Sequence, residues 1–476
     1  MRAHMTWLTD DEKRLIVEEA LGILENVGFR AAGSRVLPLL ADAGATVDFE
    51  SGAMRLPADL VREALGRCPR SFVMAGASSE YDVVLGEGRP FRFTPSGCGA
   101  RTIDYVTGER RPSTLEDVRL ATALNDSLPE LSVMWTMVSA TDVPPERREL
   151  LEYYTILRET DRHVTFVDCP SQVDSVKRIF EVLAGDLERF RARPRVTTLV
   201  TAASPLQVDG PVLDVHVAMA ECGAPVKVYS MTSAGATSPM TIAGTVTQGV
   251  AEFLAIATML QIAVPGTRVI FCCGSGVLDM RHTTFSIGCL ENAMVSVAAT
   301  EVGHYMGVPT MNPAMSTDAR YPGIQAGYEK ALKALTVCSA NPDLVSGWGL
   351  LDSSSMLYLP QIVIDNEIAQ MVRRLLSEVD VSEASIMPDA FARVGIGGDF
   401  LREKDTARRT RAGEYFMPQV ANRLPYEVWQ KAGKTEDDAA RAVIERVMTA
   451  RADRRPGLAD DQLAELAAIC GIEGTA

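Results

Sequence analysis

The stretch VKVYSMTSAGATSPMTIAGTVTQGVAEFLAIATMLQIAVPGTRVIFCCG, from Val226 to Gly274, contains two short β-prone runs separated by a Gly/Thr-rich loop and a helical segment. The two runs, VKVYSM and RVIFCC, are apolar on both faces, which is typical of strands that are covered on both sides. A strand, a helix and a second strand in this order favour a parallel βαβ unit. A closed barrel and an open, doubly wound sheet would both produce this local pattern.

The same alternation extends in both directions from this stretch. We predict eight strands, which begin near Phe93, Ser132, Val164, Thr197, Val226, Val269, Val308 and Val345. Each interval is long enough for a strand, a loop, a helix and a returning loop. Eight units in succession, without a GxGxxG turn after the first strand, favour closure. The sequence therefore predicts an α/β protein built on a (β/α)₈ TIM barrel.

The remaining segments divide the chain into three parts. Residues 1–90 are predicted to form an N-terminal cap of helices and a β-ribbon, residues 91–376 the barrel catalytic domain, and residues 377–476 a C-terminal helical extension. The extension ends in two helical stretches, Glu436 to Arg451 and Ala459 to Cys470. These stretches pack either on the barrel or on a sister subunit, and we expect the protein to form a homo-oligomer.

Local signals support structure in the cap. Thr9 and Glu12 have the spacing of a capping box ahead of an amphipathic helix. Residues 59–67 predict a second short helix. The run VDFESGAMRL, with Ser51-Gly52 at its centre, predicts a hairpin.

Composition excludes several classes of function. With 47 Lys and Arg residues against 62 Asp and Glu residues, the 476-residue chain has a formal charge of -15, which opposes binding to nucleic acid or to anionic membranes. The N-terminal residues do not form a signal peptide, and no apolar run is long enough to cross a bilayer, so we expect a cytoplasmic protein. The nine cysteines include no CxxC pair and are interpreted as free, buried thiols.

Barrel enzymes bind substrates at the carboxyl ends of their strands, and these ends contain few acids, bases or nucleophiles here. Ser, Thr, Gly and Met predominate in runs such as SGCGARTID, TAASPLQVD and GWGLLDSSS. Asp352 is the one ionisable group in the turn after the last strand. No two histidines share metal-ligand spacing, and the aspartates are scattered, so we predict no protein-bound metal.

Aromatic residues occur near several predicted strand ends. Trp135, Phe166, Tyr229 and Trp348 could surround a methylated ammonium group, because each ring contributes roughly 0.5 to 2 kcal/mol of cation-π attraction. Aromatic residues on strands are more often core residues, and that alternative stays open. The Gly/Thr-rich loop after Ser233 could hold an anion at a helix start, or it could simply pack closely.

Three motifs, in this order along the chain, resemble the trimethylamine methyltransferase superfamily. They are DYVTGERRPSTLEDV from Asp104, SPMTIAGTVTQGVAEFLAIATMLQIAVPGTRVIFCCG from Ser238, and GWGLLDSSS followed by QIVIDNEI from Gly347. The resemblance covers most of the chain. It implies a barrel that takes a methyl group from a methylated amine and transfers it to Co(I) of a partner corrinoid (cobalamin) protein, with no cofactor bound by the chain itself.

The resemblance also implies specific site residues. Founding members carry pyrrolysine where this chain has ordinary serines, so Ser354 and Ser355 are predicted at the catalytic position of a non-pyrrolysine branch. Members of that branch use quaternary amines such as glycine betaine, carnitine or proline betaine. Glycine betaine members have a histidine near Ser346 to Trp348, which this chain lacks. Ser275 and Asn312 are predicted as polar anchors of the substrate.

The predicted function is therefore corrinoid-dependent transfer of a methyl group from a quaternary or tertiary methylated, betaine-like amine. In such a transfer from a quaternary amine the leaving group is a neutral tertiary amine that needs no proton, which is consistent with strand ends that offer few acids and bases. Asp352 would then be a counter-charge or a structural group. Two alternatives stay open: an unrelated barrel lyase, for which Lys227 is the candidate Schiff-base lysine, and a non-catalytic protein that binds methylated amines.

Overall fold

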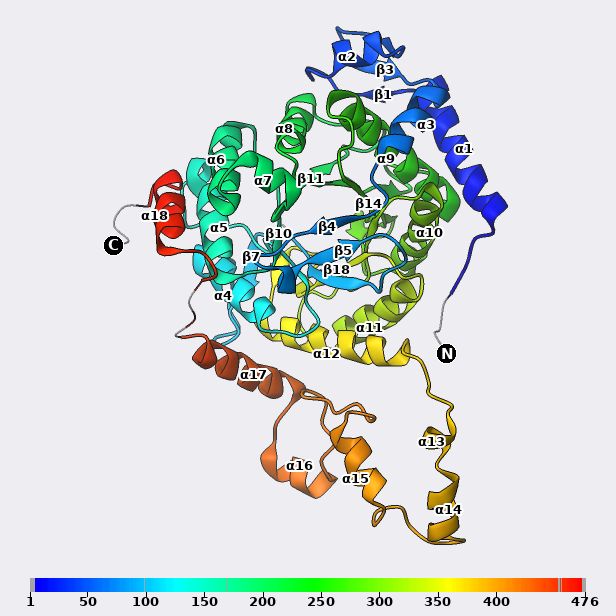
Figure 1. Cartoon of the computed structure of the whole chain (residues 1–476), viewed down its shortest axis with the longest axis vertical. Coiled ribbons are helices and arrows are strands. Elements are labelled where there is room, and N and C mark those ends of the chain that lie inside the picture. Colours follow the sequence, from blue (N-terminus) through cyan, green and yellow to red (C-terminus); the bar gives the residue numbers. More distant parts are fainter. Residues whose placement is uncertain (1–4, 98, 168, 453, 455, 473–476) are drawn as a thin grey trace.

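The computed structural model describes residues 5–472 except 98, 168, 453 and 455. Eight parallel strands form one sheet in the order β6-β18-β17-β14-β12-β11-β10-β9 (Figure 1). Their bounds are β6 Arg92–Pro95, β9 Val133–Trp135, β10 His163–Phe166, β11 Val196–Thr201, β12 Val226–Ser230, β14 Val269–Cys273, β17 Thr310–Pro313 and β18 Leu344–Trp348. The amide of Ser132 donates to the carbonyl of Phe93 at 3.0 Å, so the sheet closes on itself. The predicted (β/α)₈ barrel is confirmed.

A helix follows each strand and covers the outside of the barrel. These helices are α4 Leu115–Asp126, α5 Pro145–Glu159, α6 Val173–Ala184, α8 Gly210–Glu221, α9 Ile242–Ala263, α10 Leu290–Met306, α11 Ile324–Ser339 and α12 Leu359–Leu375, with the short α7 Leu187–Ala192 after α6. Every residue of β12 and β14 is buried, which explains why both runs are apolar on both faces. Only α9 is long and apolar enough to cross a membrane among the described residues, and 83% of its most apolar window is buried inside the protein.

The amino-terminal end of the barrel is closed by a hairpin. Strands β4 (Phe72–Met74) and β5 (Val83–Leu85) pair antiparallel and lie across the barrel opening (Figure 1). Their apolar side chains form one cluster with inward-facing residues of the barrel strands, including Leu199 and Ile270. This hairpin belongs to the predicted cap, but it serves as the floor of the barrel.

The rest of the N-terminal segment packs on the side of the barrel against α9. Helices α1 (Asp10–Asn26) and α3 (Ala58–Arg67) contact α9, while α2 (Leu37–Asp42) lies beside a three-stranded sheet of β1 Phe29–Arg30, β2 Thr46–Val47 and β3 Ala53–Arg55. The predicted capping box is confirmed, because Thr9 Oγ1 accepts from the amide of Glu12 and the Glu12 carboxylate accepts from the amide of Thr9. The predicted hairpin corresponds to the antiparallel pairing of β2 with β3.

After α12 the chain forms an arm that projects from the body (Figure 1). The arm contains the short helices α13 Glu383–Ile386, α14 Pro388–Val394, α15 Lys404–Arg411 and α16 Tyr426–Ala432. Many of its large apolar side chains are exposed, among them Ile396, Leu401 and Tyr426. Self-association through this segment stays a prediction.

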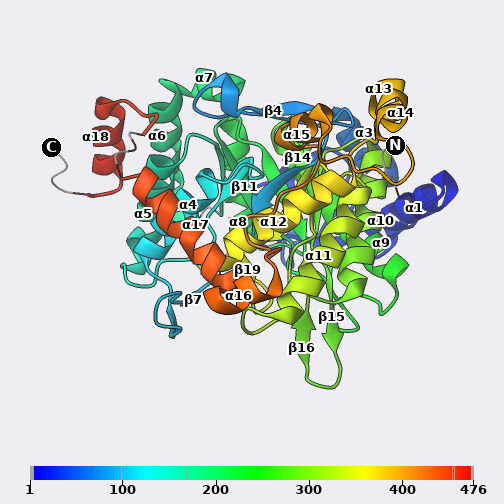
Figure 2. The same ribbon diagram turned by 90° about the horizontal axis from the view of Figure 1, so that it is seen from below.

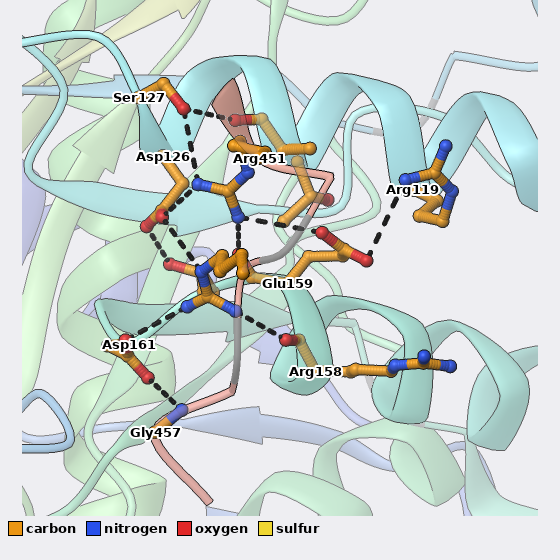
Figure 3. A network of polar contacts seen from close by, with 12 residues as sticks. Arg119, Asp126, Ser127, Arg158, Glu159, Asp161, Arg451 and Gly457 are labelled. Carbon is orange, nitrogen blue, oxygen red and sulfur yellow. Dashed lines mark hydrogen bonds and ion pairs between the residues drawn. The ribbon is translucent and has the colours of Figure 1, made fainter. Parts of the chain in front are cut away.

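The chain then returns to the barrel through α17 (Glu436–Ala450) and α18 (Asp460–Ile469), which contact α12 and α6 respectively. Figure 3 shows the polar network that fixes this return. Arg451 donates to the Asp126 carboxylate at 2.7 Å and to the carbonyl of Glu159 at 2.6 Å, and the amide of Gly457 donates to Asp161 at 3.0 Å. The part of the extension that follows the arm is therefore anchored to the ends of α4 and α5.

Small sheets project beyond the carboxyl ends of the barrel strands (Figure 2). One sheet combines β7 Arg101–Ile103, β8 Arg110–Pro112, β19 Leu350–Leu351 and β20 Met356–Leu357, and another combines β13 Ser233–Ala234, β15 Gly276–Asp279 and β16 Thr284–Ser286. The turn between β19 and β20 contains Asp352 to Ser355. These sheets extend the barrel wall and form the rim of its mouth.

Candidate active site

A cavity of about 290 Å³ lies at the carboxyl ends of the barrel strands. Its apolar wall comprises Trp135, Leu199, Tyr229, Met231, Ile287 and Pro313, its hydroxyl wall comprises Ser96, Thr201, Ser316, Ser346, Ser353, Ser354 and Ser355, and Gly97 and Gly274 complete the lining. Among these described lining residues there is no carboxylate, histidine, lysine, arginine or cysteine. The cavity can therefore enclose and orient a small ligand, but its lining offers no strong acid or base.

Two glycines allow the aromatic rings to lie close to the backbone. A Cβ atom at Gly97 would collide with the indole nitrogen of Trp135, and one at Gly274 would collide with the hydroxyl of Tyr229. Trp135 and Tyr229 are both about 8% exposed, so their rings form compact walls of the cavity. Glycine is required at these positions because of space, and the shape of the cavity depends on it.

We expect Gly274→Ala to weaken binding of the substrate by about tenfold, which corresponds to about 1.4 kcal/mol. The added methyl group must displace the Tyr229 ring, and the ring can move only into the cavity or into its packed surroundings. Calorimetry on the purified variant measures this effect. Gly327→Ala is the matched control, because a Cβ atom there meets nothing within 4 Å. Equal affinities of the Gly274→Ala variant and the wild type would contradict the assignment of Tyr229 to the wall.

The serine turn that follows the last barrel strand has an uncommon backbone. Asp352, Ser353 and Ser354 have φ angles of 53°, 52° and 68°, so three successive residues with side chains adopt the left-handed conformation. Backbone hydrogen bonds hold the turn, since the amide of Asp352 donates to Ala319 at 2.8 Å. Left-handed residues of this kind carry strain that the surrounding structure must offset, and they gather at functional sites.

The hydroxyls of this turn differ in their partners. Ser96 Oγ donates to Ser354 Oγ at 3.3 Å, while Ser353 Oγ donates to Asp318 at 2.8 Å. Ser355 Oγ donates to the carbonyl of Asp352 at 2.7 Å. Ser354 is thus linked to the opposite side of the lining, whereas Ser353 and Ser355 also stabilise the turn.

The carboxylate of Asp352 pairs with two arginines and does not line the cavity. Its carboxylate accepts from Arg110 at 2.6 Å and also contacts Arg320. The side chain of Asp352 is 7% exposed, and Asp352 is absent from the lining. Of the two roles left open by the sequence, these contacts favour the structural one.

The structure brings together four of the eight predicted site residues. Trp135, Tyr229, Ser354 and Ser355 all line the same cavity. Their side chains come from β9, from β12 and from the serine turn, which are distant in sequence. The four residues therefore share one cavity, and their roles in binding and catalysis stay predictions.

Two predicted aromatic walls lie elsewhere. Phe166 points away from the barrel interior and stacks on Tyr153 of α5, with ring centroids 3.5 Å apart. Trp348 is fully buried and packs on Phe93 at 5.8 Å, outside the cavity lining. Neither ring can act as a wall of this cavity, so both predictions need correction.

The two predicted polar anchors also lie outside the lining. Asn312 points toward α10, where its amide donates to Thr300 at 2.8 Å, and its carbonyl accepts from the amide of Cys273 at 3.1 Å. Ser275 accepts from the amide and the hydroxyl of Thr232, at 3.1 and 2.8 Å. Both residues form hydrogen bonds between neighbouring elements of the barrel, so their contacts support a structural role.

Phe166 contributes instead to a second cavity of about 260 Å³ between the barrel and α5, which also touches Trp135. Two buried glutamates of α5, Glu149 and Glu152, line it. Burial raises the pKa of Glu152 to about 7, although the amide of Ala140 donates to its carboxylate at 2.8 Å.

Sequence reasoning missed several hydroxyls of the lining, including Ser96, Thr201 and Ser346. A signal was present, because side chains alternate between the two faces of a strand. Leu199 faces the barrel interior, so Thr201 faces it too, and Leu344 predicts the same for Ser346. Selecting every second residue after the inward-facing Leu199 and Leu344 would have identified both.

Lys227 lies beneath the cavity, two residues before Tyr229 on β12. Its ammonium group donates to Thr165 Oγ1 at 2.8 Å and lies 5.0 Å from the centroid of the Trp135 ring. Burial lowers the pKa of Lys227 to about 8. The lysine does not line the cavity, which leaves the Schiff-base alternative without a reachable amine.

Residues of the Ser238 to Gly274 motif support the wall from behind. Glu252 is fully buried and accepts hydrogen bonds from Ser204, Ser230 and Gln248 at 2.9, 2.6 and 3.0 Å. Thr241 caps the start of α9 by accepting from the amide of Gly244. The Gly/Thr-rich loop is thus closely hydrogen-bonded, which favours packing over anion binding there.

The described histidines do not form a metal-binding site. His163 is the first residue of β10, where it contacts Thr197 at 2.6 Å, and His216 contacts Thr198 at 2.6 Å. Burial lowers the pKa of each to about 3, so both are neutral at physiological pH. Within the described part of the chain, no three His, Cys, Asp or Glu side chains gather as metal ligands would; the absence of a protein-bound metal stays a prediction, and Cys98 and Asp168 lie outside the described residues.

Comparisons with known proteins agree with this architecture. The family model for trimethylamine methyltransferase (MTTB) matches residues 1–470. The chain is 27% identical to a trimethylamine methyltransferase MttB of Desulfitobacterium hafniense over 440 residues, covering 92% of this chain and 88% of the relative. It is 29% identical to a glycine betaine methyltransferase of the same species over 428 residues, covering 89% of this chain and 88% of the relative.

A solved structure supports the fold. The monomethylamine methyltransferase MtmB of Methanosarcina barkeri superposes with a TM-score of 0.53 and 12% identity, covering 98% of this chain and 89% of that chain. The match of the family model over almost the whole sequence is decisive. The chain belongs to the trimethylamine methyltransferase (MTTB) family.

Proposed function

We propose that this protein transfers a methyl group from a quaternary or tertiary methylated amine to Co(I) of a partner corrinoid protein. The observation that supports the proposal most directly is the cavity at the barrel mouth, whose described lining combines aromatic rings and hydroxyls without an acid or base. Family membership adds the reaction class of the relatives. The methyl donor and the corrinoid partner are part of the proposal.

The cavity lining fits the chemical needs of this transfer. A quaternary ammonium, or a tertiary amine that is already protonated, transfers its methyl group as an electrophile and departs as a neutral amine that keeps the electron pair of the broken C–N bond, so the site need not supply a proton. The reduced corrinoid supplies the nucleophile when the partner is bound. The chain therefore has to bind the amine, exclude water and aim one methyl group toward the mouth, which is catalysis by orientation and desolvation.

The residues of the cavity divide these tasks. The rings of Trp135 and Tyr229 offer faces and edges that exclude water and contact methyl groups. The hydroxyls of Ser96, Thr201 and Ser346 supply hydrogen bonds that fix the rest of the substrate. Ser354 lies in the strained turn, so its position is set by backbone geometry.

A methyl transfer assay tests the proposal. Each assay contains the purified protein, cob(I)alamin prepared with a chemical reductant, and one amine. The amines tested are trimethylamine, tetramethylammonium, glycine betaine and choline. At least one amine should produce the spectrum of methyl-Co(III) faster than in matched mixtures that lack the protein. The same amine should also bind by calorimetry without the corrinoid.

The outcome separates the proposal from its main alternative. If an amine binds tightly but no amine yields methyl-Co(III), with free cob(I)alamin or with a corrinoid protein from the same source, the chain is a binding protein for methylated amines. A cytoplasmic location and a homo-oligomeric state accompany the proposal. Gel filtration with light scattering measures the oligomeric state directly.

A further inference from the structure

Lys227 is a buried cation without a carboxylate partner. Its side chain crosses the barrel interior from β12 to β9 and β10, where Thr165 is its hydrogen-bond acceptor and the Trp135 ring lies above it. The residue is fully buried. No Asp or Glu within the described residues forms an ion pair with Lys227, so its charge is uncompensated within this part of the chain.

The other buried lysines of the barrel are better supported. Lys330 forms an ion pair with Asp365 at 2.8 Å and also donates to a backbone carbonyl at 2.7 Å. Lys333 donates to the carbonyls of Ile287 and Ser316. Burying a charge without such partners costs several kcal/mol. The position of Lys227 is therefore costly unless a ligand supplies the opposite charge.

The groups that face Lys227 do not supply this charge. His163 of β10 is neutral, because burial lowers its pKa to about 3. Cys272 of β14 is a neutral thiol, because burial raises its pKa. Thr165 is uncharged, and the Trp135 ring offers only its π face. The centre of the barrel beneath the cavity floor is thus positively charged.

The cavity itself is rich in hydrogen-bond donors. The indole nitrogen of Trp135 is buried and has no hydrogen-bond acceptor among the described residues. The hydroxyls of Thr201, Ser316 and Ser346 also line the cavity, and none of the three donates to another described residue, so each can donate to a ligand. There is no carboxylate among the described lining residues to attract a bare cation. A positive charge below and free donors around the floor favour the negatively charged end of a ligand there.

We propose that Lys227 determines substrate specificity: it favours methylated amines that also carry an anionic group, and it orients that group toward the floor with the methylated nitrogen toward the mouth. This inference rests on the proposed function for the identity of the ligand. The orientation places the methyl group on the side from which a partner approaches. Lys227 acts through the electrostatic field of its ammonium group, which lies beneath the Trp135 ring, and it is not itself a catalytic residue.

Calorimetry with a matched pair of ligands tests the inference on the full chain. Glycine betaine and choline share the trimethylammonium group, but only glycine betaine carries a carboxylate. We expect the wild type to bind glycine betaine at least tenfold more tightly than choline. Lys227→Met should abolish this preference, and Lys227→Arg should retain it. Lys431→Met, at an exposed lysine of α16, should leave the preference unchanged.

The pH dependence gives a second measurement that needs no variant. The ammonium form of Lys227 is present below its pKa of about 8 and is lost above it. The preference of the wild type for glycine betaine should therefore be full at pH 7 and should decline several-fold by pH 9. In Lys227→Met, the ratio of the two affinities should not change with pH. The wild-type series tests the inference even if a variant does not fold.

Two results would overturn the inference. One is a wild type that binds choline as tightly as glycine betaine, or that binds neither, and the other is a preference that survives unchanged in Lys227→Met. The proposed function can fail separately. If the preference depends on Lys227 but no amine undergoes methyl transfer, the role of Lys227 in specificity is supported and the proposed function is rejected. Conversely, methyl transfer from cations without a carboxylate preference would retain the function and reject the role of Lys227.

Discussion

Lys330→Met is expected to lower the free energy of unfolding by about 3 to 5 kcal/mol, because it leaves the carboxylate of Asp365 buried without its partner. Both side chains of this ion pair are fully buried, with 2.8 Å between the ammonium nitrogen and the carboxylate oxygen. Burial lowers the pKa of Lys330 and raises that of Asp365, while their mutual attraction opposes both shifts.

The same lysine also fixes two segments of the cavity wall. It donates to the carbonyl of Met315 at 2.7 Å and to that of Gly347 at 3.3 Å. Ser316 and Ser346, which line the cavity, are the neighbours of these residues. The variant should therefore lose affinity for the substrate in addition to stability.

Chemical denaturation followed by circular dichroism measures the loss. Lys330→Met combined with Asp365→Leu removes both charges and should recover at least half of it, since a buried ion pair is often replaceable by apolar residues. Arg62→Met is the exposed control, because the ion pair of Arg62 with Glu18 is about half exposed and should contribute less than about 1 kcal/mol. A single variant as stable as the wild type would show that Asp365 does not need the lysine.

Trp135→Ala is expected to reduce kcat/KM for the proposed methyl transfer by about 30-fold, which corresponds to about 2 kcal/mol of lost contact with the methylated amine. The Trp135 ring is part of the cavity lining and also covers the ammonium group of Lys227. Without the ring, the cavity becomes larger and wetter. A methylated ammonium group then loses its apolar contact and meets the positive charge directly.

Steady-state kinetics, together with calorimetry on the same preparations, measure this effect. Trp135→Phe keeps an aromatic face and should retain most of the activity. Trp429→Ala, in the projecting arm, removes an indole at a distance from the cavity and should leave kcat/KM unchanged. A Trp135→Ala variant that folds and works within threefold of the wild type would remove Trp135 from the site.

The sequence predicted the barrel well because the physical signal for each strand is local. Strands such as β12 and β14 are buried on both faces, so their residues are apolar throughout, and each predicted start lies within two residues of the observed one. The hairpin β4–β5 was not predicted as a floor. Its short apolar strands look like any surface ribbon until the barrel beneath them is known.

The candidate site was predicted only in part because a strand has two faces. Trp135 and Tyr229 face the interior and were placed correctly in the lining, whereas Phe166 and Asn312 face outward toward helices. Trp348 shows a further difficulty. Alternation from Ser346 would direct it inward, but the register between β18 and β6 shifts after Val345, and the ring turns onto Phe93.

Lys227 shows what a sequence pattern does not reveal. Within VKVYSM it is a single charged residue in an apolar run, and the sequence suggested only a nucleophilic role for it. Its role depends on the absence of a carboxylate around it among the described residues, since a fully buried charged side chain is usually paired. Only the contacts of the folded chain distinguish Lys227 from Lys330.

The hairpin β4–β5 closes the amino-terminal end of the barrel. Its apolar side chains pack against inward-facing residues of the barrel strands, so the described residues leave no passage from the mouth through that end. Under the proposed function, the methylated amine, the methyl acceptor and the demethylated amine would therefore all use the mouth. Binding and release would then follow a fixed order, and a docked partner would retain the demethylated amine until the partner dissociates.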